Sequence, residues 1–404
     1  MVEKTLGDVA TYINGRAFKP QEWETSGRPI IRIQNLTNST QECNRTTKQF
    51  EEKYRISDGD LLFAWSASLG AHIWHGEDGW LNQHIFKVIP NESIDKIYLY
   101  YYLLYVVDQL YAKTHGSGMV HITLKPFKST RIMLPELNEQ RRVVGKIESL
   151  FAKLDEAKEK AQAVVDSFET RKAAILHKAF TGELTAKWRE EHGISIDNWK
   201  TTRFDSVAAI RSNLVDPAEY QSFPHIAPDN IEKKTGVLLE YHTIAEDGVT
   251  SGKHRFYSGQ ILYSKIRPYL SKAVVVDFDG LCSADMYPIE AYQNARCLWY
   301  YMLSDEFLLQ ASTAGSRSVL PKINQKELSA LTVHLPTNDR EQEEIARILD
   351  ELFDKEQRAK VAAESVLEQI DTIKKSILSR AFRGELGTND PSEESAVELL
   401  KQIF

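Results

Sequence analysis

The sequence predicts an α/β protein with two globular α/β regions, related by pseudo-two-fold symmetry and separated by two long antiparallel helices that form a coiled coil. Three observations predict this fold. Residues 139–180 recur as residues 341–382 with no gap. Both copies carry apolar residues in heptad phase. The region before each copy mixes short strand-like runs with helical runs.

Each copy of the long segment has the features of a helix. The apolar positions are Ile147, Phe151, Leu154, Ala161, Val165, Phe168, Ile175 and Ala179 in the first copy, and Leu349, Phe353, Ala363, Leu367, Ile370, Ile377 and Ala381 in the second. This a/d spacing is typical of helices that pack on each other. Each copy follows a proline and ends at a glycine, Gly182 or Gly384, as helices often do. At 1.5 Å per residue, we expect each helix to be roughly 60 Å long.

The repeat continues through the globular regions. Residues 5–10, 57–63 and 99–104 are echoed by residues 203–208, 257–263 and 298–303. The chain is therefore an internal repeat of one structural unit, present in two copies. We expect four segments: a globular region at 1–134, the first long helix and a linker at 135–198, a second globular region at 199–334, and the second long helix and tail at 335–404.

The order of these segments predicts how the helices meet. The first helix joins the two globular regions, and the second helix leaves the second region. The two apolar seams can meet only if the second helix runs back antiparallel to the first. We therefore expect the C-terminal end of the second helix to lie beside the first globular region.

Within each globular region, residues 60–90 and 260–290 show short apolar runs that predict strands. The tyrosine-rich stretches 97–111 and 298–310 predict helices. Their aromatic side chains favour a place in the core over a platform for stacking bases.

The net charge of −7 argues against a simple basic nucleic-acid binder, so the location of the charge matters. Residues 5–134 hold 14 Lys and Arg against 13 Asp and Glu, and residues 200–334 hold 14 against 15. Residues 335–404 hold 10 against 16, which places most of the acidity on the second helix and tail. A solvated or partner-facing helix is a better interpretation of this excess than a DNA-binding surface.

The sequence shows neither a membrane-spanning run nor an export signal, because the most apolar stretch, 97–107, is too short to cross a bilayer. The three cysteines, Cys43, Cys282 and Cys297, are odd in number and lack metal-ligand spacing. They are typical of reduced cysteines in a cytoplasmic protein, which is the location we expect.

The motifs of common enzymes are missing from the sequence. Residues 248–254 resemble a phosphate-binding loop but are one residue short and lack the metal-binding Ser or Thr. Residues 228–234 hold the residue types of a metal nuclease, but the acidic pair is too close in sequence to lie on adjacent strands. The histidines show no spacing with acidic residues that indicates a metal site or a general base. We expect no catalytic residue, bound cofactor or metal in this chain.

Several of the repeated stretches resemble one known family. They are residues 6–9, 59–63 and 134–140, the run Ala-Phe-Thr-Gly-Glu-Leu-Thr-Ala-Lys-Trp-Arg at 179–189, and their echoes in the second half. Across the whole chain they resemble the specificity subunit of type I restriction-modification systems. The tail departs from the pattern, because no second Trp-Arg follows Gly387.

The resemblance implies two target-recognition domains, each reading one half of a split, asymmetric site in double-stranded DNA. It implies that the helices act as a ruler and as the dock for two adenine methyltransferase subunits, with motor-nuclease subunits joining them. S-adenosylmethionine, ATP and Mg are then expected on these partners. Two readers at a fixed separation agree with a target of two half-sites and a spacer of fixed length.

Cationic, amide and aromatic residues lie at matching places in the predicted loops. The DNA-binding candidates are Arg16, Lys19, Arg32, Gln34 and Asn35 in the first half, and Arg211, Lys265, Arg267, Tyr269, Arg317 and Lys322 in the second. Arg and Lys can contact guanine edges or phosphates, and Asn and Gln can pair with adenine. An alternative hypothesis is a non-catalytic coiled-coil scaffold that binds protein partners with its two end domains. It accounts for the helices and the acidic tail but less well for these loop residues.

Overall fold

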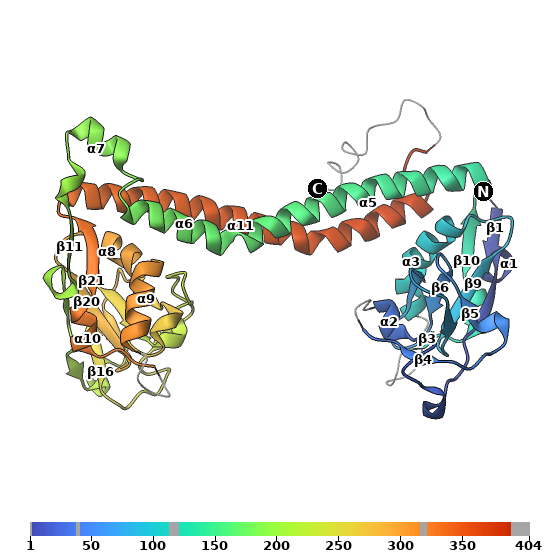
Figure 1. Cartoon of the computed structure of the whole chain (residues 1–404), viewed down its shortest axis with the longest axis horizontal. Coiled ribbons are helices and arrows are strands. Elements are labelled where there is room, and N and C mark those ends of the chain that lie inside the picture. The colour runs from blue at the N-terminus through green and yellow to red at the C-terminus, as the bar shows by residue number, and fades with distance from the viewer. Residues whose placement is uncertain (1, 38–40, 113–120, 316–320, 389–404) are drawn as a thin grey trace. The chain divides into compact units, whose positions relative to one another are not determined.

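The computed structural model describes residues 2–37, 41–112, 121–315 and 321–388 (Figure 1). Contacts divide the chain into two compact units. Unit 1 comprises residues 1–162 and 364–404, and unit 2 comprises residues 163–363. Helix α11 (Asp339–Phe382) begins in unit 2 and ends in unit 1.

Unit 1 contains two four-stranded sheets and one two-stranded sheet. The first sheet has the order β2 (Ala10–Asn14), β9 (Ile85–Pro90), β6 (Leu61–Ala64), β7 (Gly70–Ile73), and the second has the order β4 (Asn44–Thr46), β3 (Arg28–Ile31), β8 (Gly79–Leu81), β5 (Arg55–Ile56). The two-stranded sheet pairs β1 (Val2–Thr5) with β10 (Arg131–Leu134). The helices are α1 (Leu6–Val9), α2 (Ile33–Thr37), α3 (Lys96–Ala112), α4 (Leu124–Lys128) and α5 (Leu137–Asp166), with 3-10 turns η1 (Pro20–Glu22) and η2 (Glu52–Tyr54).

Unit 2 repeats this topology, with one additional strand, β13, at the edge of the second sheet. Its first sheet has the order β12 (Ala208–Ile210), β20 (Met286–Ala291), β17 (Ile261–Ser264), β18 (Ala273–Val275), and its second has the order β13 (Leu214–Val215), β16 (Lys253–Phe256), β19 (Gly280–Cys282), β14 (Pro224–Ile226), β15 (His242–Thr243). The third pairs β11 (Trp199–Arg203) with β21 (Thr332–Pro336). The helices are α6 (Phe168–Phe180), α7 (Ala186–His192), α8 (Ala295–Met302), α9 (Asp305–Ala314) and α10 (Gln325–Ala330), with 3-10 turns η3 (Ile196–Asn198), η4 (Phe204–Ser206), η5 (Pro217–Tyr220), η6 (Pro228–Asn230) and η7 (Pro268–Leu270). In both units, one parallel pair, β3 with β8 or β14 with β19, lies inside an otherwise antiparallel sheet.

Each globular region has three layers, and strand alternation explains them. In β6, Leu61 and Phe63 face the helix α3, whereas Leu62 faces the second sheet. In β17, Ile261 and Tyr263 face α8, and Leu262 faces the second sheet. Side chains of a strand point alternately to opposite faces, so a strand between two apolar layers is buried along its whole length. The predicted α/β class is confirmed. The stretch 97–111 forms the helix α3 as expected, whereas the stretch 298–310 forms two helices, α8 and the start of α9.

In unit 1, α5 and the last part of α11 lie side by side (Figure 1). Ile147, Leu150 and Leu154 pack in one core with Ile377 and Ala381. These residues belong to the predicted heptad seam or its neighbours. The C-terminal part of α11 therefore packs in the same core as α5 and the first globular region's helix α3, as expected.

Two polar contacts in unit 1 show that these helices are antiparallel. Lys374 donates to Asp155 at 2.6 Å, and further along the chain Thr388 donates to Glu139. The residue number on the first helix decreases as the residue number along α11 and beyond it increases, as in an antiparallel pair. The same holds in unit 2, where Arg171 donates to Glu356 at 2.7 Å and Thr185 donates to Glu341 at 2.8 Å.

The first long helix differs from the expectation of one uninterrupted segment. It ends as α5 at Asp166 and resumes as α6 at Phe168, whereas α11 is unbroken over 44 residues. Ser167 Oγ donates to the carbonyl of Ala163, one turn earlier. Such back-bonding competes with the helical ladder and often bends a helix. The equivalent position in α11 is Gln369, which has no hydroxyl to make this contact.

The glutamine of the repeated Glu-Gln pair attaches each long helix to its globular region. Gln140 donates to the carbonyl of Pro135 at 2.8 Å, and Gln342 donates to that of Pro336 at 2.8 Å. Gln140 also accepts from the backbone N–H of Asp95 at 2.8 Å. Both glutamines are buried, so these bonds fix the helix start against the preceding strand.

Candidate nucleic-acid interface

The loop after the central strand of the first sheet starts alike in both units, but it is longer in unit 2, where eight residues instead of five precede the next strand. In unit 1 it follows β6 and carries Ala67 at φ 59°, and in unit 2 it follows β17 and carries Arg267 at φ 48°. A backbone hydrogen bond holds the first residue of each loop. Ile122 N–H donates to the carbonyl of Trp65 at 3.0 Å, and Ile323 N–H donates to the carbonyl of Lys265 at 2.9 Å. We call these the Ala67 loop (residues 65–70) and the Arg267 loop (residues 265–271).

The Arg267 loop is held in place by several contacts. Arg267 N–H donates to the carbonyl of Pro321 at 2.7 Å, and Leu270 N–H donates to the carbonyl of Arg267 at 2.8 Å. Pro268 is buried beside Gly315, where a Cβ would lie 2.9 Å from the proline ring. A non-glycine residue with positive φ costs about 1–2 kcal/mol. Such backbone strain is typical of functional sites whose surroundings enforce it.

The Arg267 side chain is exposed, as is Tyr269, which retains 47% of its surface. No carboxylate pairs with the Arg267 guanidinium within the described part of the chain. An arginine held out on a braced loop is free to contact a guanine edge or a phosphate.

Three other candidates of unit 2 have acidic partners. Lys322 and Lys265 both approach Asp285, at 3.0 Å and 3.9 Å. Burial lowers the pKa of Lys265, and the neighbouring Lys322 lowers it further. Arg211 pairs with Glu290 at 2.7 Å on an exposed surface. Arg317 lies outside the residues that the structure describes.

Some candidates of unit 1 are engaged by hydrogen bonds within the chain, and others are exposed. Arg16 makes two hydrogen bonds to Glu22, at 3.0 and 2.7 Å, and lies over the rings of Phe18 and Phe50. The hydrogen bonds from Arg16 lower the pKa of Glu22 to about 2. Lys19, three residues before Glu22, is exposed.

Three further candidates of unit 1 lie on or before the short helix α2. Arg32 lies over the Trp23 ring at 5.6 Å, and Gln34 is half-buried. Asn35 is buried, with its amide oxygen accepting from the backbone N–H of Arg32 at 3.0 Å and its amide nitrogen donating to the carbonyl of Gln41 at 3.1 Å. The Asn35 amide is therefore engaged by its own loop.

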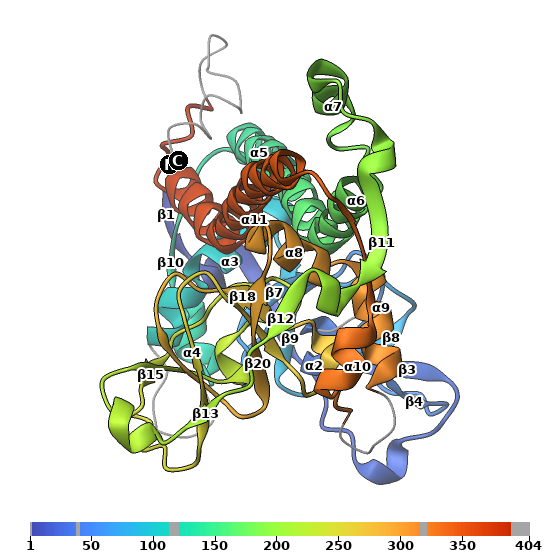
Figure 2. The ribbon, with the colours of Figure 1, turned by 90° about the vertical axis from the view of Figure 1, so that its left-hand side faces the viewer.

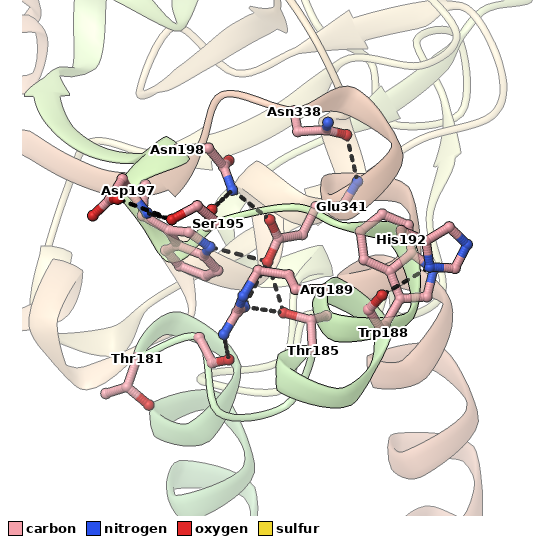
Figure 3. Close-up of polar contacts among 12 residues, drawn as sticks. Thr181, Thr185, Trp188, Arg189, His192, Ser195, Asp197, Asn198, Asn338 and Glu341 are labelled. Atoms are coloured by element: carbon pink, nitrogen blue, oxygen red, sulfur yellow. Dashed lines mark hydrogen bonds and ion pairs between the residues drawn. The ribbon is translucent and has the colours of Figure 1, made fainter.

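Sequence reasoning missed a buried polar cluster around Glu341 (Figure 3). Its carboxylate is fully buried and accepts from Arg189 at 2.7 Å, Thr185 at 2.8 Å, Asn198 at 2.9 Å and Trp199 at 3.0 Å. Although burial raises the pKa of Glu341, these four donors outweigh it, and the pKa lies below the ordinary value of a glutamate. The repeated Glu-Gln pair and the Ala-Lys-Trp-Arg run were both visible in the sequence, but nothing in it showed that they meet.

The Glu341 cluster joins three elements of unit 2. Arg189 lies on α7, Trp199 begins β11, and Glu341 lies in the first turns of α11. Helix α7 stands apart from the globular region and is connected to it through β11 (Figure 2). The cluster therefore ties the linker between the helix and the second globular region to the start of the second long helix.

The described residues contain no group of three or more His, Cys, Asp or Glu side chains placed to hold a metal ion. The loop-like run 248–254 leads into the strand β16 rather than into a helix, so it lacks the helix N-terminus that a phosphate loop requires. Among the helices that the structure describes, none is both long and apolar enough to cross a membrane.

Comparison with known proteins identifies the family. Residues 1–165 and 196–364 match the family model described as the type I restriction modification DNA specificity domain. The chain belongs to this family. The match covers both globular regions and the start of the helix that follows each of them, as the internal repeat requires.

Relatives of this specificity subunit share most of its length. The chain is 37% identical over 345 residues to the type I restriction enzyme EcoDI specificity subunit of Escherichia coli, covering 78% of each protein. It is 26% identical over 435 aligned positions to the EcoBI specificity subunit of the same species, covering 99% of this chain and 90% of that one.

Solved structures share the fold at low sequence identity. A crystal structure of the HsdS subunit from Thermoanaerobacter tengcongensis is 18% identical, with a TM-score of 0.64 over 95% of this chain and 97% of that one. A chain from a structure of the type I R-M system, described for its assembly and conformational transition, is 18% identical, with a TM-score of 0.68 over 95% and 98%. Both likenesses support the arrangement of two α/β regions and long helices.

Proposed function

We propose that this specificity subunit reads a bipartite, asymmetric site in double-stranded DNA, with one half-site for each globular region. The observation that carries the proposal is the pair of equivalent loops. They share a positive-φ residue and a closing backbone bond, but one presents Ala67 and the other Arg267, and the second loop is longer. Equivalent loops with different side chains and lengths suit two readers of different base sequences.

The partner assignment is part of the same proposal. The antiparallel helical pair occurs once in each unit, which supports docking of two copies of one partner, an adenine methyltransferase subunit. Motor-nuclease subunits then join this assembly. S-adenosylmethionine, ATP and Mg²⁺ are bound by the partners, and this chain positions them on DNA without performing chemistry itself.

The charge distribution supports weak DNA binding by the chain alone. Most sequence-independent affinity for DNA comes from neutralising phosphates with Lys and Arg. Both globular regions are near neutral, and several of their candidate cations are paired with acids. Tight binding then requires the surface of the methyltransferase partner as well.

The test is to sequence methylated adenines in cells that carry the methyltransferase partner with and without this chain. The proposal expects methylation at one bipartite motif with a fixed spacer, and none without the chain. It also expects that the purified chain alone transfers no methyl group from S-adenosylmethionine. Unchanged methylation in the absence of the chain would favour the scaffold that binds only protein partners.

A further inference from the structure

Lys172 on α6 is a buried lysine without a carboxylate partner. Only 7% of its surface is exposed, and its Nζ donates to the backbone carbonyl of Lys234 at 2.5 Å. The ammonium also lies 5.7 Å from the centre of the Phe353 ring on α11. No carboxylate within the described ranges is in ion-pair distance of it. A buried ammonium without a counter-ion is destabilising, so stability of the fold does not account for it.

The internal repeat supplies a natural comparison. The equivalent residue in unit 1 is Lys374, which lies 5.1 Å from the ring of Phe151, the equivalent of Phe353. Lys374 donates instead to Asp155 on the neighbouring helix at 2.6 Å. The position equivalent to Asp155 in unit 2 is Gln357, which carries no charge. The two equivalent lysines therefore make different contacts. Lys374 bonds the neighbouring helix in unit 1, and Lys172 bonds the globular region in unit 2.

Lys234 is the link between Lys172 and the Arg267 loop. Its carbonyl accepts from Lys172, and its own N–H donates to the carbonyl of Leu270 at 3.0 Å. Leu270 N–H in turn donates to the carbonyl of Arg267 at 2.8 Å. Lys234 has φ 62° and Arg267 has φ 48°, so both ends of this hydrogen-bond chain are in a backbone conformation that must be held by contacts.

The turn that contains Lys234 is itself packed tightly on α8. Gly236 has φ 76°, and a Cβ at this position would lie 2.3 Å from the Trp299 ring. Glu232 N–H donates to the carbonyl of Val237 at 2.9 Å and closes the turn. The turn is thus a rigid spacer between the helix α6 and the Arg267 loop.

We propose that Lys172 is a positioning residue that couples the long helix to the Arg267 loop through the backbone of Lys234, and so sets how the second globular region discriminates its half-site. The inference rests on the proposed function in DNA recognition. It adds that the helices carrying the partner subunits and the loop carrying Arg267 are one mechanical unit. In the described part of unit 1, Lys374 pairs with Asp155 instead.

Three variants of the full chain test the coupling. Lys172→Met removes the ammonium and keeps the aliphatic length. Gln357→Asp leaves Lys172 in place but offers it the carboxylate that Asp155 offers to Lys374, in competition with Lys234. The matched control, Lys374→Met, removes the equivalent lysine and its exposed ion pair in unit 1.

The first measurement is amide hydrogen exchange of the chain, followed in peptides that cover residues 232–238 and 265–272. Lys172→Met and Gln357→Asp are expected to speed exchange of both peptides, and Lys374→Met to leave them unchanged. Unchanged exchange in both unit 2 variants overturns the coupling. Should Lys172→Met fail to fold, Gln357→Asp decides, because Gln357 is exposed on α11.

The second measurement is methylation by the chain with its methyltransferase, on DNA duplexes carrying the mapped site or one substitution in either half-site. The two unit 2 variants are expected to lose roughly two- to thirtyfold of the discrimination at the second half-site and none at the first. Equal loss at both half-sites, or none at either despite faster loop exchange, overturns the coupling. A wild-type chain that discriminates neither half-site overturns the proposed function itself.

Discussion

At the scale of single residues, we propose Arg267 as the side chain on which the reading of the second half-site most directly depends. It is exposed on a braced loop, and no described carboxylate neutralises it. Arg267→Ala is expected to cost about 1–3 kcal/mol of discrimination at one position of the second half-site, because a base contact is lost. Methylation rates on substituted duplexes measure this.

The control for this variant is Arg203→Ala in the same unit. Arg203 is exposed and pairs with Asp205 at 2.6 Å on the strand β11, outside the Arg267 loop. It is expected to leave discrimination unchanged. An equal loss of binding on every sequence after Arg267→Ala would instead mark Arg267 as a phosphate contact.

The candidate residues show how far a sequence can predict such a site. Arg267 was predicted because it stands after an apolar strand and before a proline, and the structure places it on an exposed loop. Asn35 was predicted as an amide among cationic and polar loop residues, but its amide is engaged by the backbone of Arg32 and Gln41. An asparagine that closes its own turn and one that reads adenine have the same sequence signature, because both follow turn residues.

Glu341 is the residue whose loss is expected to be most damaging to unit 2. Glu341→Gln introduces an amide nitrogen among four donors and leaves Arg189 buried without its counter-ion. Breaking a buried ion pair on one side costs about 3–5 kcal/mol. Thermal unfolding of the full chain is expected to show a transition at lower temperature. Glu344→Gln, which removes the ion pair with Arg347 within α11, serves as the control and is expected to change the transition little, because Arg347 is exposed. A small loss in Glu341→Gln would mean that the cluster contributes little to stability.

Lys172 gives the stability of unit 2 a dependence on pH. Burial lowers its pKa to about 8 from the ordinary 10.5, and Glu169 on α6 and Glu232 on the neighbouring turn oppose this, whereas Lys360 on α11 adds to it. Between these two pKa values the unfolded chain binds more protons than the folded chain, so stability increases as the pH rises. Relative to Lys172→Met, the wild type is expected to gain up to about 3 kcal/mol between pH 8 and 10.5.

Denaturant unfolding of the two proteins at several pH values measures this difference, and other titrating groups cancel between them. Lys374→Met, which removes a partly exposed and carboxylate-paired lysine, is the control. A difference that stays constant over the window would show that Lys172 is charged in the fold without cost.

At the scale of elements, the heptads and the glycines at the helix ends predicted the long helices. They did not predict that the first long helix is divided into α5 and α6. The break at Ser167 depends on a hydroxyl that bonds back to the previous turn. Neither helix propensity nor apolar periodicity registers such a bond. The sheets were predicted only as short strands, because the parallel pairs β3 with β8 and β14 with β19 join segments about fifty residues apart.

The long helices are expected to set the spacer of the DNA target. Adding one heptad to α5 and one to α11 preserves the apolar seam and lengthens each helix by about 10 Å. Since B-DNA rises about 3.4 Å per base pair, the spacer is expected to grow by about three base pairs. Mapping methylated adenines measures it. An unchanged spacer with full activity would show that the helices do not set the distance between the readers.

At the scale of the whole molecule, the internal repeat is the feature that the sequence predicted most completely. Both units have the same order of strands in the first sheet, a positive-φ residue at the same place in the loop after its central strand, and the same glutamine at the start of the long helix. The copies differ at Ala67 and Arg267, at Asp155 and Gln357, and at Ser167 and Gln369, and we propose that the first two of these pairs give the two units different roles. A sequence repeat aligns such pairs, but the structure was needed to show which of them lie on a loop and which on a helix.

The central claim is that each globular region reads its own half-site. The most direct test is a chain in which residues 204–331 are replaced by residues 6–130, so that the first globular region occurs twice on unchanged helices. Methylated adenines are then mapped in cells that also carry the methyltransferase partner. The account predicts a target in which the first half-site occurs twice, the second half-site is lost and the spacer length is kept. Methylation of the original asymmetric site by this chain would contradict it.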